Sequence, residues 1–237
     1  MFSIKNWDNK TWISSKKYIN FFIIYLLKQK KLNKYSRILD IGCGRGKIIG
    51  TLASKLKMIN KPIGVDIEKY NDVDKRIYFK RINAINYLKV NKKNFDLILI
   101  KQTIHFFNNT EIKTLLNYAY KSLNNEGVIL ILSLDPKNNA IPTFPLMKKK
   151  LQISFNKDTT IRKNILSFKK KKTITKFNFK VNLKKKTYLK MIKQRYISSL
   201  LNLNNKQITE GIRQLNLKYN DNISFKDRLN CIMFKKN

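Results

Sequence analysis

The chain has 237 residues, of which 43% are hydrophobic, so it is long enough to bury the core of one domain with additions. Its 51 Lys and Arg residues against 14 Asp and Glu give a formal net charge of +37, which favours anionic partners and opposes self-association. The two cysteines, Cys43 and Cys231, lie far apart with no metal-ligand spacing, which argues against a disulfide framework and a zinc site.

Lysine dominates the basic residues, with 43 Lys against 8 Arg, and Lys, Asn and Ile together make up 104 residues of the chain. A bias toward A/T-rich codons produces this composition in any protein. Arginine is also preferred over lysine where a protein reads phosphate groups. The charge is concentrated in residues 148–195, with 18 basic groups and one acidic group. Net charge alone therefore does not assign a nucleic-acid partner.

Residues 1–35 are predicted to be an N-terminal helical segment. Its apolar run, residues 18–27, is too short to span a bilayer. Lysines follow the run, and the small-residue cleavage site of a signal peptide is absent. The pattern favours a buried helix packed on the edge of a sheet, and a helix lying on a membrane surface is the alternative.

The next stretch, residues 37–46, reads RILDIGCGRG and predicts a strand followed by a glycine turn. A helical pattern begins at Lys47, where the third glycine of the dinucleotide fingerprint G-x-G-x-x-G would stand. The P-loop pattern is absent as well. An acid, Asp40, precedes the first glycine, and a carboxylate there suits a ligand with an ammonium and a sulfonium better than a pyrophosphate.

Further strands are predicted at residues 62–67, 77–83 and 94–102, and a fifth ends at residue 134. The second ends in Asp66, where a carboxylate can accept both hydroxyls of a ribose, and a helix N-cap is the alternative role. The fourth is almost continuously apolar, which is typical of a central parallel strand. Strands alternating with helices predict a doubly wound parallel sheet.

These motifs, together with the Phe95-Asp96 pair and Gly127, resemble the class I S-adenosylmethionine (SAM)-dependent methyltransferases. The C-terminal part is similar to the methyltransferase type 11 and trans-aconitate methyltransferase-like groups. The resemblance implies an α/β fold with a doubly wound, Rossmann-like, mostly parallel seven-stranded sheet, helices on both faces and a helical lid. It places a SAM-binding Rossmann-like core in residues 36–135. Residues 136–237 would be a basic C-terminal part with the acceptor lid and the last two strands.

The resemblance also implies SAM as the cofactor, no metal, and a set of cofactor-binding residues. Asp40 would orient the loop and reach the amino group through water, Asp66 would take the ribose, and Asn83 the adenine amino group, where the family often has Asp. Ile67 would pack on the adenine, and Lys101 would contribute backbone near the methionine portion. The full set is Asp40, Gly42, Gly44, Asp66, Ile67, Asn83, Ala84 and Lys101.

The pattern changes after residue 136. Residues 137–170 are predicted to be irregular, because they contain Pro142 and Pro145 among clustered lysines. Beyond them, the pattern predicts a half-exposed strand, two helices and a last strand, at residues 173–183, 187–203, 206–219 and 229–234.

His105 is the only histidine and the predicted catalytic residue. It follows the fourth strand, at the carboxyl end where such sheets bind ligands, and its ordinary pKa suits proton transfer near neutrality. The alternative is a histidine packed with Phe106 and Phe107. The site lacks the N/D-P-P-Y motif of adenine methylation and the Pro-Cys pair of cytosine C5 methylation.

The predicted function is SAM-dependent methyl transfer, by in-line displacement, to a small-molecule acceptor in the cytoplasm. One alternative is an RNA methyltransferase that uses the basic segment 148–195. Another is a non-catalytic SAM-binding module.

Overall fold

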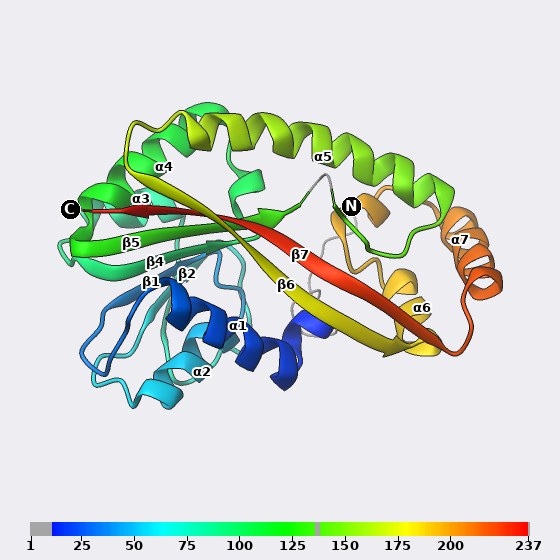
Figure 1. Ribbon diagram of the computed structural model, residues 1–237, viewed down its shortest axis with the longest axis horizontal. Coiled ribbons are helices and arrows are strands. Elements are labelled where there is room, and N and C mark those ends of the chain that lie inside the picture. The colour runs from blue at the N-terminus through cyan, green and yellow to red at the C-terminus, as the bar shows by residue number, and fades with distance from the viewer. Residues whose placement is uncertain (1–10, 136–137, 237) are drawn as a thin grey trace. The chain divides into compact units, whose positions relative to one another are not determined.

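The structure is a computed structural model that describes residues 11–135 and 138–236 (Figure 1). The chain forms two compact units that alternate along the sequence. Unit 1 contains the described parts of residues 1–18, 135–159 and 178–228, and unit 2 those of residues 19–134, 160–177 and 229–237.

The strands form one seven-stranded sheet in the order β3-β2-β1-β4-β5-β7-β6. Four neighbouring pairs are parallel, and they join β1 (Ile38–Ile41), β2 (Ile63–Asp66), β3 (Tyr78–Arg81), β4 (Phe95–Lys101) and β5 (Leu123–Leu134). Against β5 lies β7 (Asn222–Lys235), which is antiparallel, and β6 (Lys172–Lys184) is the edge strand. The predicted sheet of seven strands is therefore confirmed as a mixed sheet, parallel from β3 to β5.

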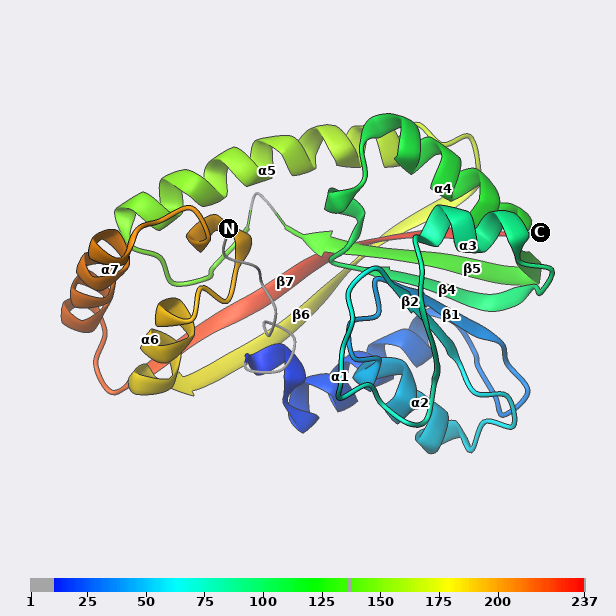
Figure 2. The same ribbon diagram turned by 180° about the vertical axis from the view of Figure 1, so that it is seen from behind.

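Helices cover both faces of the sheet in unit 2. Figures 1 and 2 show α1 and α2 on one face and α3 and α4 on the other. The helices are α1 (Lys16–Gln29), α2 (Lys47–Leu56), α3 (Ala84–Val90), α4 (Asn109–Lys121), α5 (Pro145–Leu166), α6 (Lys185–Lys193) and α7 (Asn205–Lys218). Three 3-10 turns are η1 (Trp12–Ser14), η2 (Ile104–Phe106) and η3 (Ser198–Leu200).

The first strand shows how the sheet positions its polar groups. All four residues of β1 are buried, because the strand is covered on both faces. Leu39 and Ile41 join the hydrophobic cluster formed with α3 and α4. Because side chains alternate along a strand, Ile38 and Asp40 point to the opposite face, which α1 and α2 cover. The fold thus places a carboxyl group under a helix.

The prediction for residues 137–170 was wrong, since α5 runs from Pro145 to Leu166. Proline is tolerated at the first position of a helix, because its missing N–H would have no partner there. The buried residues Met147, Leu151 and Phe155 recur every four positions on one face. Pro145 therefore begins the helix instead of breaking it.

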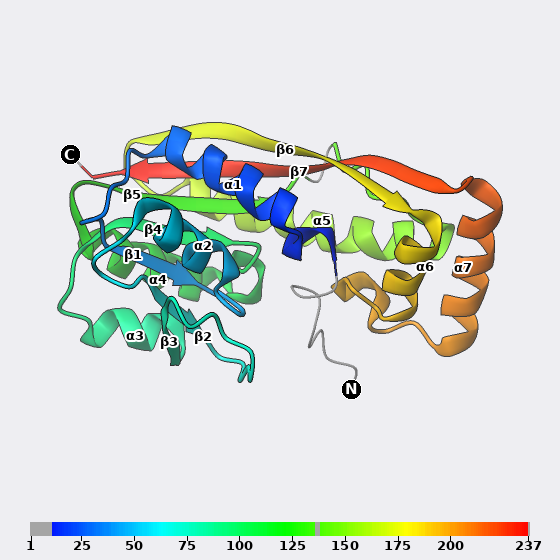
Figure 3. The same cartoon turned by 90° about the horizontal axis from the view of Figure 1, so that it is seen from below.

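The rest of the C-terminal part follows the predicted order. Strand β6 confirms the predicted strand, and Figure 3 shows β6 and β7 as long strands. The helix predicted at residues 187–203 ends early, at Lys193, and Arg195 then takes a left-handed conformation with φ of 51°. The functional division into 1–35, 36–135 and 136–237 stays a prediction.

Candidate active site

The turn between β1 and α2 is a loop of left-handed glycines. Gly42, Gly44 and Gly46 have φ of 68°, 53° and 69°. The Gly42 N–H donates to Val65 O at 2.8 Å, and the Gly46 N–H to Cys43 O at 2.9 Å. A side chain at Gly42 would place its Cβ 2.2 Å from Thr103 Oγ1. Gly42 is thus required by its backbone angle and by the Thr103 side chain of the neighbouring β4 end.

Asp66 ties this loop to the ends of β2 and β3. One carboxylate oxygen accepts the Gly44 N–H at 2.8 Å, and the other accepts the Glu68 N–H at 3.0 Å. The Asp66 carbonyl accepts the Ile82 N–H at 2.9 Å, which holds the end of β3. A carboxylate offers about four lone-pair sites, so both oxygens keep capacity for ligand hydroxyls.

Asp40 lies at the end of β1 and is buried, with 4% of its surface exposed. Burial raises the pKa of its carboxyl from 3.8 to about 8; the nearby Lys101 ammonium opposes the rise and the Asp66 carboxylate adds to it. The ammonium donates to Gln102 Oε1 at 2.6 Å and lies 5.5 Å from the centre of the Phe22 ring. The three charged groups, at the ends of β1, β2 and β4, therefore influence one another.

Two residues after β4 belong to the site but were missed by sequence reasoning. The Thr103 hydroxyl donates to Lys101 O at 3.1 Å and is 3.4 Å from Gly42 O, so it joins the β4 end to the glycine loop. Gln102 has φ of 54°, which is unusual for a residue with a side chain. A polar residue directly after a buried strand was the available signal for Thr103, whereas no pattern indicates the angle at Gln102.

Asn83, between β3 and α3, acts as a helix cap. Its side-chain oxygen accepts the N–H groups of Ile85 at 2.9 Å and Asn86 at 3.3 Å. Both lone pairs of that oxygen are therefore used within the chain. Ala84 is buried in the first turn of α3, whereas Ile67 is 63% exposed just after β2. Of these three predicted adenine contacts, Ile67 presents an apolar side chain at the surface.

Arg45 is a further residue that sequence reasoning missed. It is almost buried, its Nε donates to Asp72 Oδ1 at 2.6 Å, and its guanidinium lies 4.8 Å from the Tyr70 ring centre. Its carbonyl accepts the Asp74 N–H at 2.9 Å. Arg45 thus anchors the segment after β2 to the glycine loop. An arginine within the loop and four acids at 66–74 were the signal for this contact.

His105 lies on η2, directly after β4, and is half-buried. Its ring centre is 4.2 Å from that of Phe106, and the planes are tilted by 43°. The structure therefore brings together Asp40, Gly42, Gly44, Asp66 and Lys101, and it places His105 on the turn that continues from Lys101. The catalytic role of His105 stays a prediction.

The described residues contain no group of three His, Cys, Asp or Glu side chains arranged to hold a metal ion. What the site offers is a buried carboxyl, a second carboxylate at a strand tip, and backbone groups of a glycine loop. Such a set suits a ligand that carries a cationic end and a pair of hydroxyls. No helix among residues 11–135 and 138–236 is long and apolar enough to cross a membrane.

Comparisons with known proteins agree with this geometry. Residues 38–127, less than half of the chain, match the family described as "Methyltransferase domain". The matched segment contains β1 to β4 and the whole glycine loop. A sequence search of curated proteins finds no match.

Three solved structures illustrate the shared fold. A protein described as a methyltransferase of an antibiotic biosynthesis pathway in Anabaena variabilis has a TM-score of 0.66 at 18% identity, covering 90% of this chain and 96% of that one. A SAM-dependent methyltransferase from Archaeoglobus fulgidus has a TM-score of 0.52 at 22% identity, covering 92% and 94%. The plantazolicin methyltransferase BamL has a TM-score of 0.56 at 17% identity, covering 98% and 88%.

These likenesses confirm the Rossmann-like methyltransferase fold. The narrower trans-aconitate methyltransferase-like grouping is not established by them. Together with the domain match, the comparisons lead to one conclusion: residues 38–127 are similar to the methyltransferase domain family, and the chain shares the fold of these structures.

Proposed function

We propose that the protein is a SAM-dependent methyltransferase that acts on a small-molecule acceptor in the cytoplasm. The observation that carries the proposal is the hydrogen bond from Gly44 N–H to the Asp66 carboxylate, next to the buried Asp40. This bond holds a backbone-lined loop against a strand-tip acid at the carboxyl ends of parallel strands, where such sheets bind ligands.

The residues present fit SAM, which supplies a methyl group on a sulfonium when bound. The Asp66 carboxylate accepts the ribose hydroxyls, and Ile67 covers the adenine with its exposed side chain. Asp40 orients the glycine loop and, when ionised, favours the cationic methionine end through water. Gly42 and Gly44 contribute backbone beside the methionine end, and the backbone of Lys101 borders it.

Asn83 has a different hydrogen-bonding role in this proposal from the one predicted for it, which was to accept a hydrogen bond from the adenine amino group. Because its oxygen caps α3, the group that remains for the adenine is the side-chain NH2, which donates hydrogen bonds. Asn83 therefore contributes by donating to a ring nitrogen, and Ala84 contributes through its backbone.

The small-molecule acceptor is supported by two of the structural neighbours. BamL was crystallised with a triazolic desmethylPZN analog and SAH, and the Anabaena variabilis protein is described as part of an antibiotic biosynthesis pathway. The helical lid is part of the proposal and would come from residues 136–203. The cytoplasmic location is supported by two thiols that form no disulfide, Cys43 and Cys231.

Calorimetric titration with S-adenosylhomocysteine (SAH) tests the cofactor. The expected result is saturable binding at one site per chain, because the loop and both carboxyls are preformed. Titration with NAD at the same concentrations is the control. Absence of SAH binding by the folded wild-type protein would contradict the proposal.

Incubation of a cell extract with methyl-labelled SAM tests the acceptor. The expected result is that label enters the small-molecule fraction and not the RNA, lipid or protein fractions. Tight SAH binding with no labelled product in any fraction would favour a non-catalytic SAM-binding module.

His105 is the proposed proton-transfer residue, and His105→Gln tests it. Since general acid–base catalysis contributes about 100-fold or more, the rate of labelling should fall by at least that factor. SAH affinity should stay within about twofold, because the proposed cofactor contacts do not include the imidazole. An unchanged labelling rate would show that the reaction needs no base at this position.

RNA methylation is the second candidate, favoured by one observation. Strand β6 exposes lysines at every fourth residue, Lys172, Lys176, Lys180 and Lys184. These side chains point to the same side, because four residues is an even number along a strand. If RNA is the acceptor, label should enter it, RNA affinity should fall steeply with salt, and RNA should bind more tightly than heparin.

A further inference from the structure

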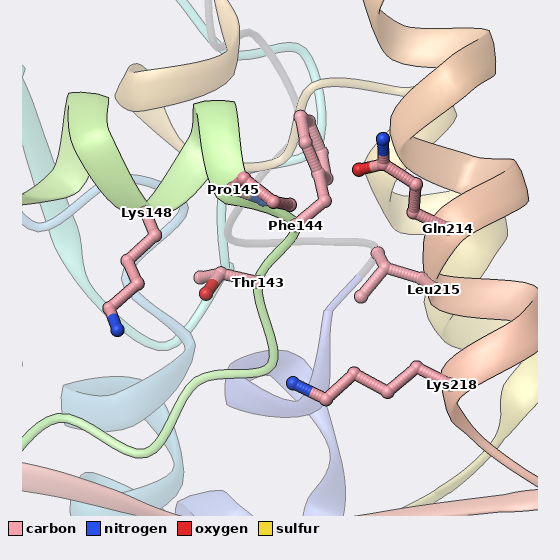
Figure 4. A pocket seen from close by; sticks show the side chains of 7 residues that line it. All are labelled: Thr143, Phe144, Pro145, Lys148, Gln214, Leu215 and Lys218. Carbon is pink, nitrogen blue, oxygen red and sulfur yellow. The ribbon is translucent and has the colours of Figure 1, made fainter.

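Unit 1 contains a cavity of about 490 Å³, a size typical of pockets for small ligands. It lies where the segment before α5 passes α7 (Figure 4). Its lining comes from these two parts of unit 1, namely Thr143, Phe144, Pro145, Lys148, Gln214, Leu215 and Lys218.

The walls of the cavity are held in place by buried contacts. Phe144 is 3% exposed, and its ring lies so close to α7 that a Cβ at Gly211 would be 2.5 Å from it. The Tyr188 hydroxyl donates to Pro142 O at 2.7 Å, which fixes the chain just before Thr143. Glycine in a helix interior costs roughly 1 kcal/mol relative to alanine. The glycine at position 211 therefore leaves the space that the Phe144 ring occupies at the wall of the cavity.

The polar groups of the cavity are cationic or neutral. Figure 4 shows the Lys148 and Lys218 side chains reaching from α5 and α7, with the Thr143 hydroxyl between their ends in this view. No acidic residue is among the lining residues. The nearby Glu210 carboxylate accepts hydrogen bonds from Gln214, at 2.9 Å, and from Arg213, at 2.7 and 2.8 Å.

The start of α5 adds to this positive field. The first turn of α5 contains no acid, although the N-terminal end of a helix favours negative charge. Instead, Lys148 follows Pro145 by three positions, and two more lysines come next. Bringing an anion to this cavity would reduce the repulsion among these charges, whereas an apolar body would cover the exposed Pro145 ring.

We infer that this cavity binds an organic anion that has an apolar body and a carboxylate or phosphate group. The anionic group lies between the ammonium groups of Lys148 and Lys218 and accepts the Thr143 hydroxyl. The apolar body lies against Phe144, Pro145 and Leu215. This site goes beyond the proposed methyl transfer and does not depend on it.

Calorimetric titration of the full-length protein in 150 mM salt, roughly the ionic strength at which exposed charges are screened beyond about 8 Å, tests the inference. The probes are octanoate and octyl phosphate, with octyltrimethylammonium as the cationic counterpart and acetate and inorganic phosphate as anions without an apolar body. Saturable 1:1 binding is expected for octanoate, octyl phosphate or both, and the two arms decide between carboxylate and phosphate. The cation and the two small ions should bind at least tenfold more weakly.

Variants separate the cavity from the general charge of the chain. The double variant Lys148→Gln/Lys218→Gln should lower octyl-anion affinity at least tenfold, and Thr143→Val should lower it about threefold. Lys149→Gln/Lys206→Gln removes the same charge from exposed positions of unit 1 outside the lining, and its affinity should match that of the wild type. Equal losses in the two double variants, or no saturable binding by the wild type, would overturn the inference.

SAH titration of the same samples keeps the two proposals apart. SAH binding without octyl-anion binding rejects the anion site alone. Octyl-anion binding without SAH binding rejects the proposed cofactor alone.

Discussion

The glycine loop of unit 2 and the cavity of unit 1 each depend on a glycine, but for different reasons. Gly42 has φ of 68° and faces the Thr103 side chain, so both its backbone angle and its surroundings exclude a larger residue. Gly211 lies inside α7, where any L-residue fits the backbone, and only the Phe144 ring occupies the space of a Cβ. One site is thus set by backbone conformation and the other by side-chain packing.

The difference extends to the charged groups. The loop lies beside two carboxyls, the buried Asp40 and the partly exposed Asp66, whose positions follow from strand ends. The cavity is lined by lysines on helices, at positions where a lysine-rich chain also has many others. A substitution at Gly42 should therefore change backbone geometry and stability together. The effect of a substitution at Gly211 should instead be reversed by a second substitution, at Phe144.

The largest effect is expected for Gly42→Ala. A left-handed angle costs an L-residue about 1–2 kcal/mol, and an overpacked side chain about 1–3 kcal/mol. The free energy of unfolding, measured by urea denaturation, should fall by roughly 3 kcal/mol. Thr103→Gly removes the crowding atoms, yet Gly42→Ala should remain destabilising in that background, since the backbone angle persists. A neutral effect there would show that crowding alone requires the glycine.

Asp66→Ala should lower SAH affinity by about 100-fold. Hydrogen bonds to a charged group contribute about 1.5–3 kcal/mol, and the variant removes the ribose acceptor together with the partner of Gly44 N–H. Calorimetric titration provides the measurement. Asp221→Ala, at an exposed position of unit 1, removes the same charge and should leave SAH affinity unchanged. A parallel loss in both variants would mean that net charge, and not the strand-tip contact, controls binding.

Gly211→Ala should destabilise the protein by roughly 1 kcal/mol, because crowding against Phe144 exceeds the gain in helix propensity. In the Phe144→Leu background the sign should reverse, and alanine should stabilise by about 0.5–1 kcal/mol. The urea midpoints of the four proteins form a double-mutant cycle that measures this. Additive effects would show that Phe144 does not require the glycine.

A pH dependence of stability is also expected, and it depends on Asp40. Its pKa is raised to about 8 in the folded protein from 3.8, so between these values the folded state binds a proton that the unfolded state has released. The free energy of unfolding should therefore fall as pH rises from about 4 to 8, by up to about 1.4 kcal/mol per pH unit, and level off above. Asp40→Asn should reduce this slope when urea unfolding is measured at pH 5, 6, 7 and 8.

The half-buried Asp158 provides the comparison for that slope. Burial raises the pKa of its carboxyl as well, so it contributes in the same direction. Asp158→Asn should nevertheless remove less of the slope than Asp40→Asn, because only Asp40 is shifted as far as about 8. An Asp40→Asn slope equal to that of the wild type would show that Asp40 is ionised in the folded protein.

The same difference, between backbone conformation and side-chain packing, separates what could be predicted from the sequence from what could not. The strand–loop–helix unit around Gly42 could be predicted, because glycine and β-branched residues have strong preferences for particular backbone conformations. The parallel pairing of β1 to β5 followed from alternation of strands and helices. Only an indirect sequence signal pointed to the contacts of Thr103 and Arg45, since the partner of each lies in a segment distant in sequence.

Two further details show why local patterns were insufficient. Pro145 was interpreted as a helix breaker, although its position at the first turn of α5 makes it compatible with a helix. Asn83 matched the spacing of an adenine-binding residue, but its oxygen already caps α3. In both cases the residue begins or caps a helix, which the local pattern alone did not indicate.

The antiparallel pairing of β5 with β7 also determines when the sheet can be completed during synthesis. Residues 229–235 of β7 pair with residues 128–134 of β5. Until they leave the ribosome, β5 is an unpaired and strongly apolar sheet edge, which invites association with other chains. This edge of the sheet is therefore protected from aggregation only once β7 has paired with β5.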